Sequence, residues 1–441
     1  MSYGLPWHQS AFEPNPDRCA FADRERSVSF RESAQESAAW ADLITQNAGT
    51  GSRIALDMPA SVSWASALHG CLLSGRIAVP IDSRWDSQLR KRMLDGASLI
   101  LTEEAVPPGS VGAASPVDHS PDAAAIVLCT SGSSGSRTEV VLSRINLASH
   151  VWAAKNAING EASDCWLSSL PVSHTGGLGV VIRCSAWGAT AMLRSKFDAI
   201  ETVALLESAE HQVTLLSVVP TTLARLLDAG LGKAPALRRV IVGGAPLTAA
   251  LRSRATEAGL PIVETWGLTQ TTGMVTVARQ IGAEGAGRPL DGIEVMTVGD
   301  GELLVRGDQV SRSATASDGW LHTGDLGRIV DGEVIIDGRS SSVIISGGEN
   351  VLPERVEMVI EELAGVASAL VYGVADERWG ESVTADVVVK SSATTIEHIE
   401  QHCRESLSPH EVPKQIRLVD SIAHGTSGKR IRPSSNRRNE S

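Results

Sequence analysis

The chain has 441 residues, a formal net charge of −12 at pH 7 and 42% hydrophobic residues. This length exceeds what one small core can hold, so two domains are expected. The acidic balance argues against a nucleic-acid partner, but it permits a small anionic ligand, which needs only local positive potential.

The cysteines and the apolar segments bear on the compartment. The six cysteines are Cys19, Cys71, Cys129, Cys165, Cys184 and Cys403. They form no CxxC pair and no zinc pattern, so we expect reduced, mostly buried thiols in a cytoplasmic protein. Residues 1–18 lack the basic start and apolar run of a signal peptide. The apolar stretch Leu178–Leu193 is broken by Arg183 and two glycines, so we expect a core segment and no membrane span.

The first half of the chain alternates helical and extended patterns. Near its start, helical spacing is seen at Ser33–Asn47 and Ser61–Ser74, and strands are predicted at Ser52–Leu56, Ile77–Pro80 and Ser98–Thr102. The alternation continues with predicted strands at Val213–Val218, Arg238–Val242 and Ile262–Glu264, and helices at Pro220–Leu227 and Leu247–Ala258. This pattern predicts a layered α/β fold with largely parallel sheets.

After about residue 286 the pattern changes. Short strands at Glu302–Arg306, Gly327–Val330 and Glu333–Asp337 alternate with Gly/Asp turns, which indicates a small antiparallel, β-barrel-like unit. A small polar stretch at 338–342 could be a hinge. Beyond it we predict helices at Pro353–Leu363 and Ile396–Leu407, with strands at Ala367–Val374 and Ala385–Val389. The sequence therefore predicts a large α/β domain at 1–340 and a small mobile α+β domain at 341–441.

One loop between two strands has the composition of a phosphate-binding loop. The apolar run Ala125–Cys129 leads into Thr130, Ser131, Gly132, Ser133, Ser134 and Gly135. Such a loop offers backbone N–H groups and hydroxyls without bulky side chains, which suits a polyphosphate. A flexible surface loop is the alternative for this segment taken alone.

Several motifs in a fixed order resemble the adenylate-forming superfamily of acyl-CoA synthetases, peptide adenylation domains and luciferases. Thr130–Gly135 resembles its phosphate loop. The later matching segments are Gly243-Gly244-Ala245-Pro246-Leu247, Trp266-Gly267-Leu268-Thr269-Gln270, Thr323-Gly324-Asp325, Gly338-Arg339, Ser346-Gly347-Gly348-Glu349 and Gly428-Lys429. The resemblance covers nearly the whole chain from about residue 35.

The resemblance implies a role for each motif. Asp325 would accept hydrogen bonds from both ribose hydroxyls, Trp266 would stack on adenine, and Arg339 would contact ribose or phosphate. Thr130 and Thr269 would contact phosphate, and Thr130 and Gln270 would lie at the Mg²⁺ site. Residues 244–246 and Gly267 would belong to the nucleotide and acyl sites. Lys429 would be the catalytic cation, bridging the acyl carboxylate and the α-phosphate.

The implied reaction has two half-reactions. The substrate carboxylate attacks the α-phosphate of ATP to give acyl-AMP and pyrophosphate, largely through positioning and electrostatics. The C-terminal domain would then rotate about Ser341 and bring Gly347 and Gly348 to the site, where CoA forms the thioester.

The chain departs from the superfamily pattern at several positions. Arg137, Thr138 and Glu139 stand where Pro-Lys-Gly usually ends the phosphate loop. Gln270 replaces a glutamate, and a neutral ligand should bind Mg²⁺ more weakly. Glu264 stands where asparagine is common. These departures motivate one alternative, a non-catalytic nucleotide- or acyl-binding homologue.

Two segments indicate which carboxylic acid is the substrate. Leu170–Leu178 and Ser346–Asn350 look most like the o-succinylbenzoate–CoA ligases of menaquinone synthesis, and in that resemblance His174 lines the acyl pocket. Another aryl- or acyl-CoA ligase, or an enzyme that loads a carrier protein, remains an alternative. The expected partners are a small, aromatic carboxylic acid and CoA. A homodimer stays open.

Overall fold

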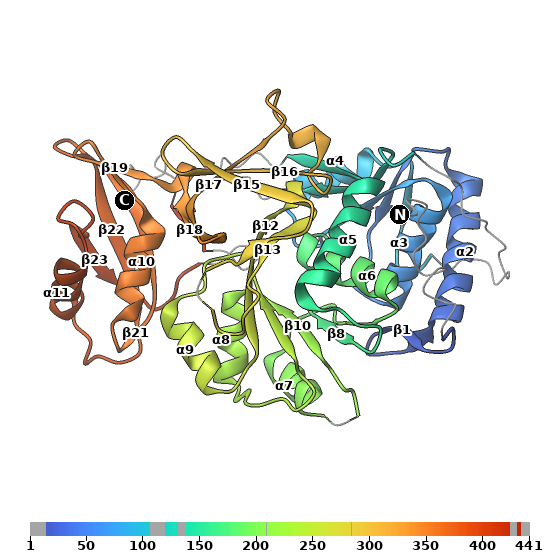
Figure 1. Cartoon of the computed structure of the whole chain (residues 1–441), viewed down its shortest axis with the longest axis horizontal. Coiled ribbons are helices and arrows are strands. Elements are labelled where there is room, and N and C mark those ends of the chain that lie inside the picture. Colours follow the sequence, from blue (N-terminus) through green and yellow to red (C-terminus); the bar gives the residue numbers. More distant parts are fainter. Residues whose placement is uncertain are drawn as a thin grey trace. The chain divides into compact units, whose positions relative to one another are not determined.

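The computed structural model describes residues 15–105, 120–130, 138–208, 210–283, 285–423 and 430–433. The chain forms two compact units. The first comprises Met1–Gly244, Ala258–Val295 and Val305–Leu321, and the second comprises Ala245–Glu257, Met296–Leu304 and His322–Ser441. The elements of each unit can be followed in Figure 1.

The first unit contains a five-stranded sheet of order β5-β3-β4-β6-β7. Its strands are β3 (Arg53–Leu56), β4 (Ile77–Pro80), β5 (Leu99–Leu101), β6 (Ala124–Cys129) and β7 (Glu139–Ser143). The first four pair in parallel, whereas β7 runs antiparallel beside β6. The helices of this part are α2 (Phe30–Asn47), α3 (Val62–Ser74) and α4 (Ser87–Asp95). Helices α2 and α3 pack closely at Gly70, which has no side chain. A Cβ added there would lie only 2.5 Å from the Cβ of Trp40.

A nine-stranded sheet of order β14-β13-β12-β11-β10-β8-β9-β1-β2 forms the rest of this unit. Its strands are β1 (Cys19–Ala22), β2 (Ser27–Ser29), β8 (Cys165–Ser168), β9 (Thr190–Leu193), β10 (Leu215–Val218), β11 (Arg239–Val242), β12 (Ile262–Leu268), β13 (Gly273–Val277) and β14 (Arg288–Pro289). The strands from β12 to β1 pair in parallel, and both ends of the sheet are antiparallel. The accompanying helices are α5 (Arg144–Ile158), α6 (Thr175–Trp187), α7 (Ala199–Glu207) and α8 (Pro220–Asp228).

Local sequence signals explain where these elements begin. Ser29 and Glu32 form a capping box at α2, and the hydroxyl of Ser61 accepts a hydrogen bond from the Trp64 N–H at α3. Helix α8 begins at Pro220, whose missing N–H costs nothing in a first turn. Every residue of β10 is buried, as expected for a strand covered on both faces.

The second unit contains helix α9 (Ala249–Glu257) and the antiparallel pair β17 (Leu321–Val330) and β18 (Glu333–Arg339). These strands belong to a four-stranded sheet, β15-β16-β17-β18, with β15 (Ile293–Val298) and β16 (Glu302–Gly307).

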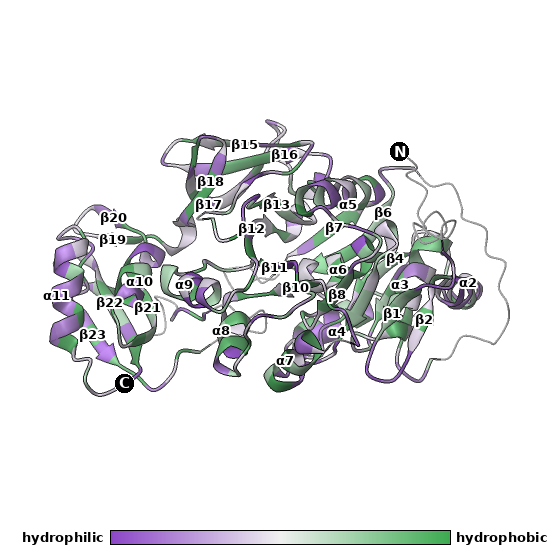
Figure 2. Cartoon of the chain, turned by 60° about the horizontal axis from the view of Figure 1, so that its bottom comes forward, coloured by the Kyte–Doolittle hydropathy of each residue, from purple (hydrophilic) through white to green (hydrophobic). Residues whose placement is uncertain are grey.

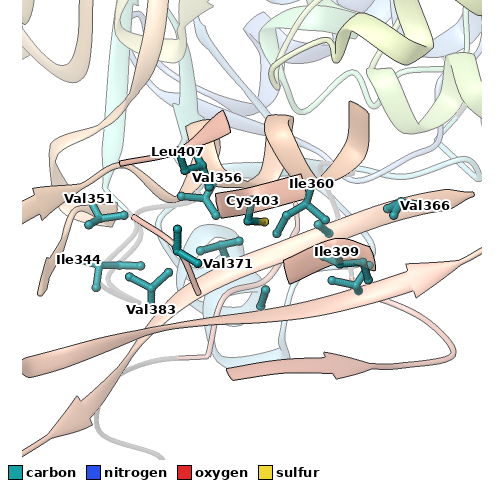
Figure 3. Close-up of a cluster of buried hydrophobic side chains, with 14 residues drawn as sticks. Ile344, Val351, Val356, Ile360, Val366, Val371, Val383, Ile399, Cys403 and Leu407 are labelled. Atoms are coloured by element: carbon teal, nitrogen blue, oxygen red, sulfur yellow. The ribbon is translucent and has the colours of Figure 1, made fainter. Parts of the chain in front are cut away.

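Its C-terminal part has a sheet of order β20-β19-β22-β21, with β23 on β22. The elements are β19 (Ile344–Ser346), β20 (Glu349–Val351), α10 (Pro353–Glu362), β21 (Val366–Asp376), β22 (Gly380–Val389), α11 (Ile396–Ser406) and β23 (Gln415–Leu418). Figure 3 shows the buried core of this part, to which α10 contributes Val356 and Ile360. Helix α11 is mainly hydrophilic in Figure 2, and its buried Ile399 and Cys403 join the same core.

The predicted α/β fold class is confirmed, but several strands were predicted too short; β22, for example, begins at Gly380 and not at Ala385. Strand β12 does not end at Glu264; it continues through Trp266 to Leu268 because β13 pairs with it there. Strand β17 begins at Leu321 and not at Gly327, since Asp325 pairs opposite Arg339 of β18. The domain boundary at residue 341 stays a prediction.

Two further expectations concern the described residues. All six cysteines lie among them and are free thiols. No helix in these ranges combines the length and apolar character needed to cross a bilayer.

Candidate active site

The predicted phosphate loop joins β6 to β7, and only its ends fall within the described residues. The N–H and hydroxyl of Thr130 both donate to the carbonyl oxygen of Thr138, at 2.9 and 3.2 Å. Thr130 therefore closes the base of the loop, while Ser131, Gly132, Ser133, Ser134 and Gly135 lie outside the described ranges. Phosphate and Mg²⁺ contacts by these residues stay predictions.

The acidic residue that follows this loop has a cationic partner. Glu139 begins β7, and its Oε2 lies 2.8 Å from a guanidinium nitrogen of Arg53 on β3. About one third of each side chain is exposed, so the attraction is partly screened by solvent. Glu139 therefore does not present an uncompensated charge beside the loop, which the sequence alone did not reveal.

Trp266 and Gly267 lie in the paired part of β12. Trp266 is buried, with 8% of its surface exposed, opposite Thr276 of β13. The strand is irregular between Trp266 and Gly267. A Cβ at Gly267 would overlap the carbonyl oxygen of Gly273, so only glycine permits this approach of the two strands.

The turn after β12 is held by backbone and side-chain hydrogen bonds. Residues Thr269–Thr271 form a 3-10 turn, and the carbonyl oxygen of Gln270 accepts from the Ser311 N–H at 2.7 Å. The Thr272 hydroxyl donates to the Gln309 carbonyl at 2.8 Å. Thr269 and Gln270 themselves are partly exposed. The turn therefore fixes their backbone and leaves two neutral oxygen-bearing side chains beside β12.

The predicted acyl loop follows β11 and approaches β12. A Cβ at Gly243 would lie 2.6 Å from Cγ2 of Thr265, and Gly244 has φ +83°. Both positions therefore favour glycine, one for space and one for backbone conformation. Ala245 is partly buried and Pro246 is exposed.

His174 precedes α6 beside a buried carboxylate. Its Nε2 lies 3.6 Å from Oδ2 of Asp82, which also accepts a hydrogen bond from Ser173 at 2.9 Å. Burial raises the pKa of Asp82, but the hydrogen bonds from Arg84 and Ser173 outweigh it and lower the pKa to about 2. An ionised Asp82 therefore lies beside His174, whose side chain is 22% exposed.

A second histidine near this helix was not anticipated. His150 of α5 is fully buried, and its Nε2 accepts from the guanidinium of Arg183 on α6 at 3.0–3.2 Å. Burial and Arg183 together lower the pKa of His150, so the imidazole is neutral. A Cβ at Gly273 would lie 3.6 Å from its ring. No linear motif marks this pair, because the two residues lie on different helices, 33 positions apart in the sequence.

In the second unit, Asp325 and Arg339 are brought together by strand register. They stand opposite each other on β17 and β18, with 2.6 Å between Arg339 Nε and Asp325 Oδ1. Asp325 is buried, whereas 42% of the Arg339 side chain is exposed. The Asp325 N–H donates to the Thr323 hydroxyl at 3.0 Å, which fixes the strand. A buried carboxylate next to an accessible guanidinium suits a ligand with hydroxyls and phosphate.

Gly347 and Gly348 form the tight turn between β19 and β20. Both have positive φ, at +63° and +87°. The Gly347 N–H donates to the Trp379 carbonyl at 2.8 Å, and a Cβ at Gly347 would lie 2.8 Å from the Trp379 ring. Trp379 is 37% exposed, and the cation of Arg378 lies 4.8 Å from its ring centre. The turn thus sits beside an accessible aromatic ring that the motifs did not single out.

The remaining predicted site residues concern the cation and the metal. Lys429 lies outside the described residues. Within those residues no group of three or more His, Cys, Asp or Glu side chains could hold a metal ion. Oxygen ligation of Mg²⁺ by Thr130 and Gln270 stays a prediction; this ion commonly takes few protein oxygens and completes its shell with phosphate and water.

The comparisons with known proteins cover nearly the whole chain. The family described as AMP-binding enzyme matches residues 8–107 and 93–313, and its C-terminal domain matches 355–429. A 2-succinylbenzoate–CoA ligase of Bacillus cereus is 30% identical, covering 95% of each chain. The o-succinylbenzoate CoA synthetase from Bacillus subtilis, solved with its acyl-adenylate intermediate, is 25% identical with a TM-score of 0.86, covering 99% and 98%. The same enzyme solved with ATP and magnesium has a TM-score of 0.85 at 25% identity, covering 96% and 97%.

Proposed function

The chain belongs to the family of AMP-binding enzymes, and from this premise we propose that it is an o-succinylbenzoate–CoA ligase. It would activate the acid with ATP and then transfer the acyl group to CoA. The observation that carries the adenylating part is the pairing of Asp325 with Arg339 at 2.6 Å, since both residues were expected at the ribose and phosphates. Similarity over nearly the full length supports the choice of acid.

In the first half-reaction, a carboxylate oxygen of the acid bonds to the α-phosphorus and the bond to pyrophosphate breaks. Asp325 would hold the ribose hydroxyls and Trp266 would pack on adenine, so that nucleotide and acid meet in a fixed geometry. Lys429 and Arg339 would offset the charge that develops on the phosphate oxygens. Mg²⁺, when bound, would neutralise part of the triphosphate charge, with Thr130 and Gln270 as oxygen ligands.

In the second half-reaction, the sulfur of CoA bonds to the acyl carbonyl carbon and loses its proton to solvent, and AMP leaves with the electrons of the broken bond between that carbon and the phosphate oxygen. The turn at Gly347 and Gly348 lacks side chains and lies beside Trp379, which suits passage of a thin thiol-bearing chain. The turn belongs to residues 341–441, and this is the part of the chain proposed to rotate about Ser341 between the two steps.

His174 would contribute to the acid-binding site. Its neighbour Asp82 is ionised and buried, so it would place a negative charge beside the imidazole in that site. A cytoplasmic location and a homodimeric assembly belong to the same proposal, and chromatography with light scattering would test the latter.

ATP–pyrophosphate exchange with o-succinylbenzoate tests the proposal. We expect exchange that depends on this acid, followed by an acyl-CoA product when CoA is added. No exchange across a panel of aromatic and aliphatic acids, with the protein folded, would favour a non-catalytic binding protein. Exchange without reaction with CoA, but with acyl transfer to a carrier protein, would favour the carrier-loading alternative.

Lys429→Ala separates the two half-reactions. Adenylate formation should be abolished, because the bridging cation is lost, while thioester formation from supplied acyl-AMP should persist. Equal loss of both steps would contradict the assigned role.

A further inference from the structure

Helix α10 carries three acidic residues on the side that faces its own sheet. Glu354, Glu357 and Glu361 are spaced by three and four residues and therefore share one helix face. Glu357 and Glu361 lie among the apolar positions of the helix and are buried, although their side chains are acidic. Carboxylates in such a place require cationic or N–H partners.

The backbone of β21 supplies one set of partners. Oε1 of Glu357 accepts from the Val371 N–H at 2.9 Å, and Oε1 of Glu361 accepts from the Ala369 N–H at 2.8 Å. These bonds fix both carboxylates against the strand. The acidic residues are therefore a rigid feature of this part of the chain.

Two arginines from the terminal segment supply the charge. A guanidinium nitrogen of Arg430 lies 2.5 Å from Glu361, another lies 3.3 Å from Glu357, and the group also donates to the Ala369 carbonyl at 2.6 Å. Arg432 reaches Glu357 at 2.7 Å and Glu354 at 3.1 Å. Only about a quarter of each arginine side chain is exposed.

The segment between the arginines is also fixed through its backbone. The Ile431 N–H donates to the Ala423 carbonyl at 2.9 Å, and Arg432 Nε donates to the Val371 carbonyl at 3.0 Å. Burial raises the pKa of Glu357, and the two arginines oppose that rise. We call Arg430, Arg432 and the three glutamates the arginine clamp.

The clamp is adjacent in sequence to the residue assigned the adenylating charge, because Lys429 is bonded directly to Arg430. Consecutive Cα atoms are about 3.8 Å apart, so a fixed Arg430 limits where its neighbour can go. An unrestrained terminal lysine would lose entropy each time it met the substrate.

We propose that Arg430 and Arg432 are positioning residues for adenylation, which hold the terminal segment on α10 so that Lys429 is presented from a fixed anchor. The inference rests on the proposed function, since it assumes that Lys429 acts in the first half-reaction. It assigns a role to two side chains that contact α10 and β21.

The test compares the half-reactions in full-length variants. Arg430→Ala and Arg432→Ala should lower kcat for ATP–pyrophosphate exchange by about 10- to 100-fold, as misplacement of a reacting group does, with little change in the KM for ATP. Thioester formation from supplied acyl-AMP should stay within about twofold of the parent, because Lys429 is not needed there. Hydrogen exchange should show that the Ile431 amide loses its protection in both variants.

The matched control is Arg417→Ala. Arg417 is paired with Asp386 at 2.7 Å in the same part of the chain, but it is twelve residues away from Lys429. Its variant should keep both half-reactions and the protection of Ile431. The double variant Arg430→Met with Glu361→Gln removes the contact without leaving that carboxylate charged, so it should fold and still show the selective loss.

Three outcomes would overturn the inference. They are unchanged exchange in both arginine variants, equal loss of the two half-reactions in the double variant, and a loss of exchange with the Ile431 amide still protected. Failure of the proposed function looks different, because the parent protein itself would then show no exchange with any acid.

Discussion

The Asp325–Arg339 pair makes a quantitative prediction about the nucleotide. Asp325 is buried, so hydrogen bonds to its carboxylate are little screened by solvent. Asp325→Asn keeps the side-chain shape and one acceptor oxygen but removes the charge. A hydrogen bond to a charged group contributes about 1.5–3 kcal/mol, so we expect kcat/KM for ATP to fall by about 10- to 150-fold.

The assay is pyrophosphate exchange with ATP, 2′-deoxy-ATP and 3′-deoxy-ATP. In the parent protein each missing hydroxyl should lower kcat/KM, because the carboxylate loses a donor. In Asp325→Asn the ratio of kcat/KM for ATP to kcat/KM for each deoxy analogue should fall towards one. Arg339 is 42% exposed and can be solvated in the variant, so the unfolding temperature should change little. Equal deoxy-nucleotide penalties in the parent and the variant would refute the ribose assignment.

Three more predictions follow from individual contacts. The pKa of Asp82 falls from 3.8 to about 2 on folding, so the unfolded chain binds more protons than the folded chain between these pH values. This shift contributes about 2 kcal/mol to the free energy of unfolding above pH 4, and the contribution should be lost as the pH falls towards 2. In urea unfolding, Asp82→Asn should flatten this pH dependence. Gly267→Ala should destabilise the fold by several kcal/mol in thermal unfolding because of its overlap with Gly273, whereas Gly232→Ala, with open space around it, should be neutral. Arg53→Ala should raise the KM for ATP about two- to fivefold by unpairing Glu139, and adding Glu139→Ala should reverse this; a rise that persists in the double variant would contradict the charge argument.

The sequence predicted elements whose signals are local. Strand Ile77–Pro80 was placed with its observed bounds, and α10 begins at Pro353 as its composition indicated. The C-terminal end of β12 was missed, because the pairing that extends the strand to Leu268 comes from β13 and not from its own residues. Propensity within one segment carries no information about such a partner.

In the candidate site, too, local motifs could be predicted from the sequence, whereas contacts between distant segments could not. Asp325 and Arg339 could be nominated from motifs, but their contact follows from the β17–β18 register. The carboxylate partners of Arg430 lie some seventy residues earlier on α10, so nothing in the terminal segment itself indicates what its arginines contact. The spacing of Glu354, Glu357 and Glu361 among apolar residues was the available signal for a buried ionic cluster.

The Arg53–Glu139 ion pair has a consequence for how related chains are compared. Taken singly, Glu139 counts as a defect in the phosphate loop, whereas with Arg53 it is one half of a neutral unit. In related chains we therefore expect that an acidic residue after the phosphate loop occurs together with a basic residue at the start of β3. A chain that keeps the acid and lacks the base would be the better candidate for lost ATP use.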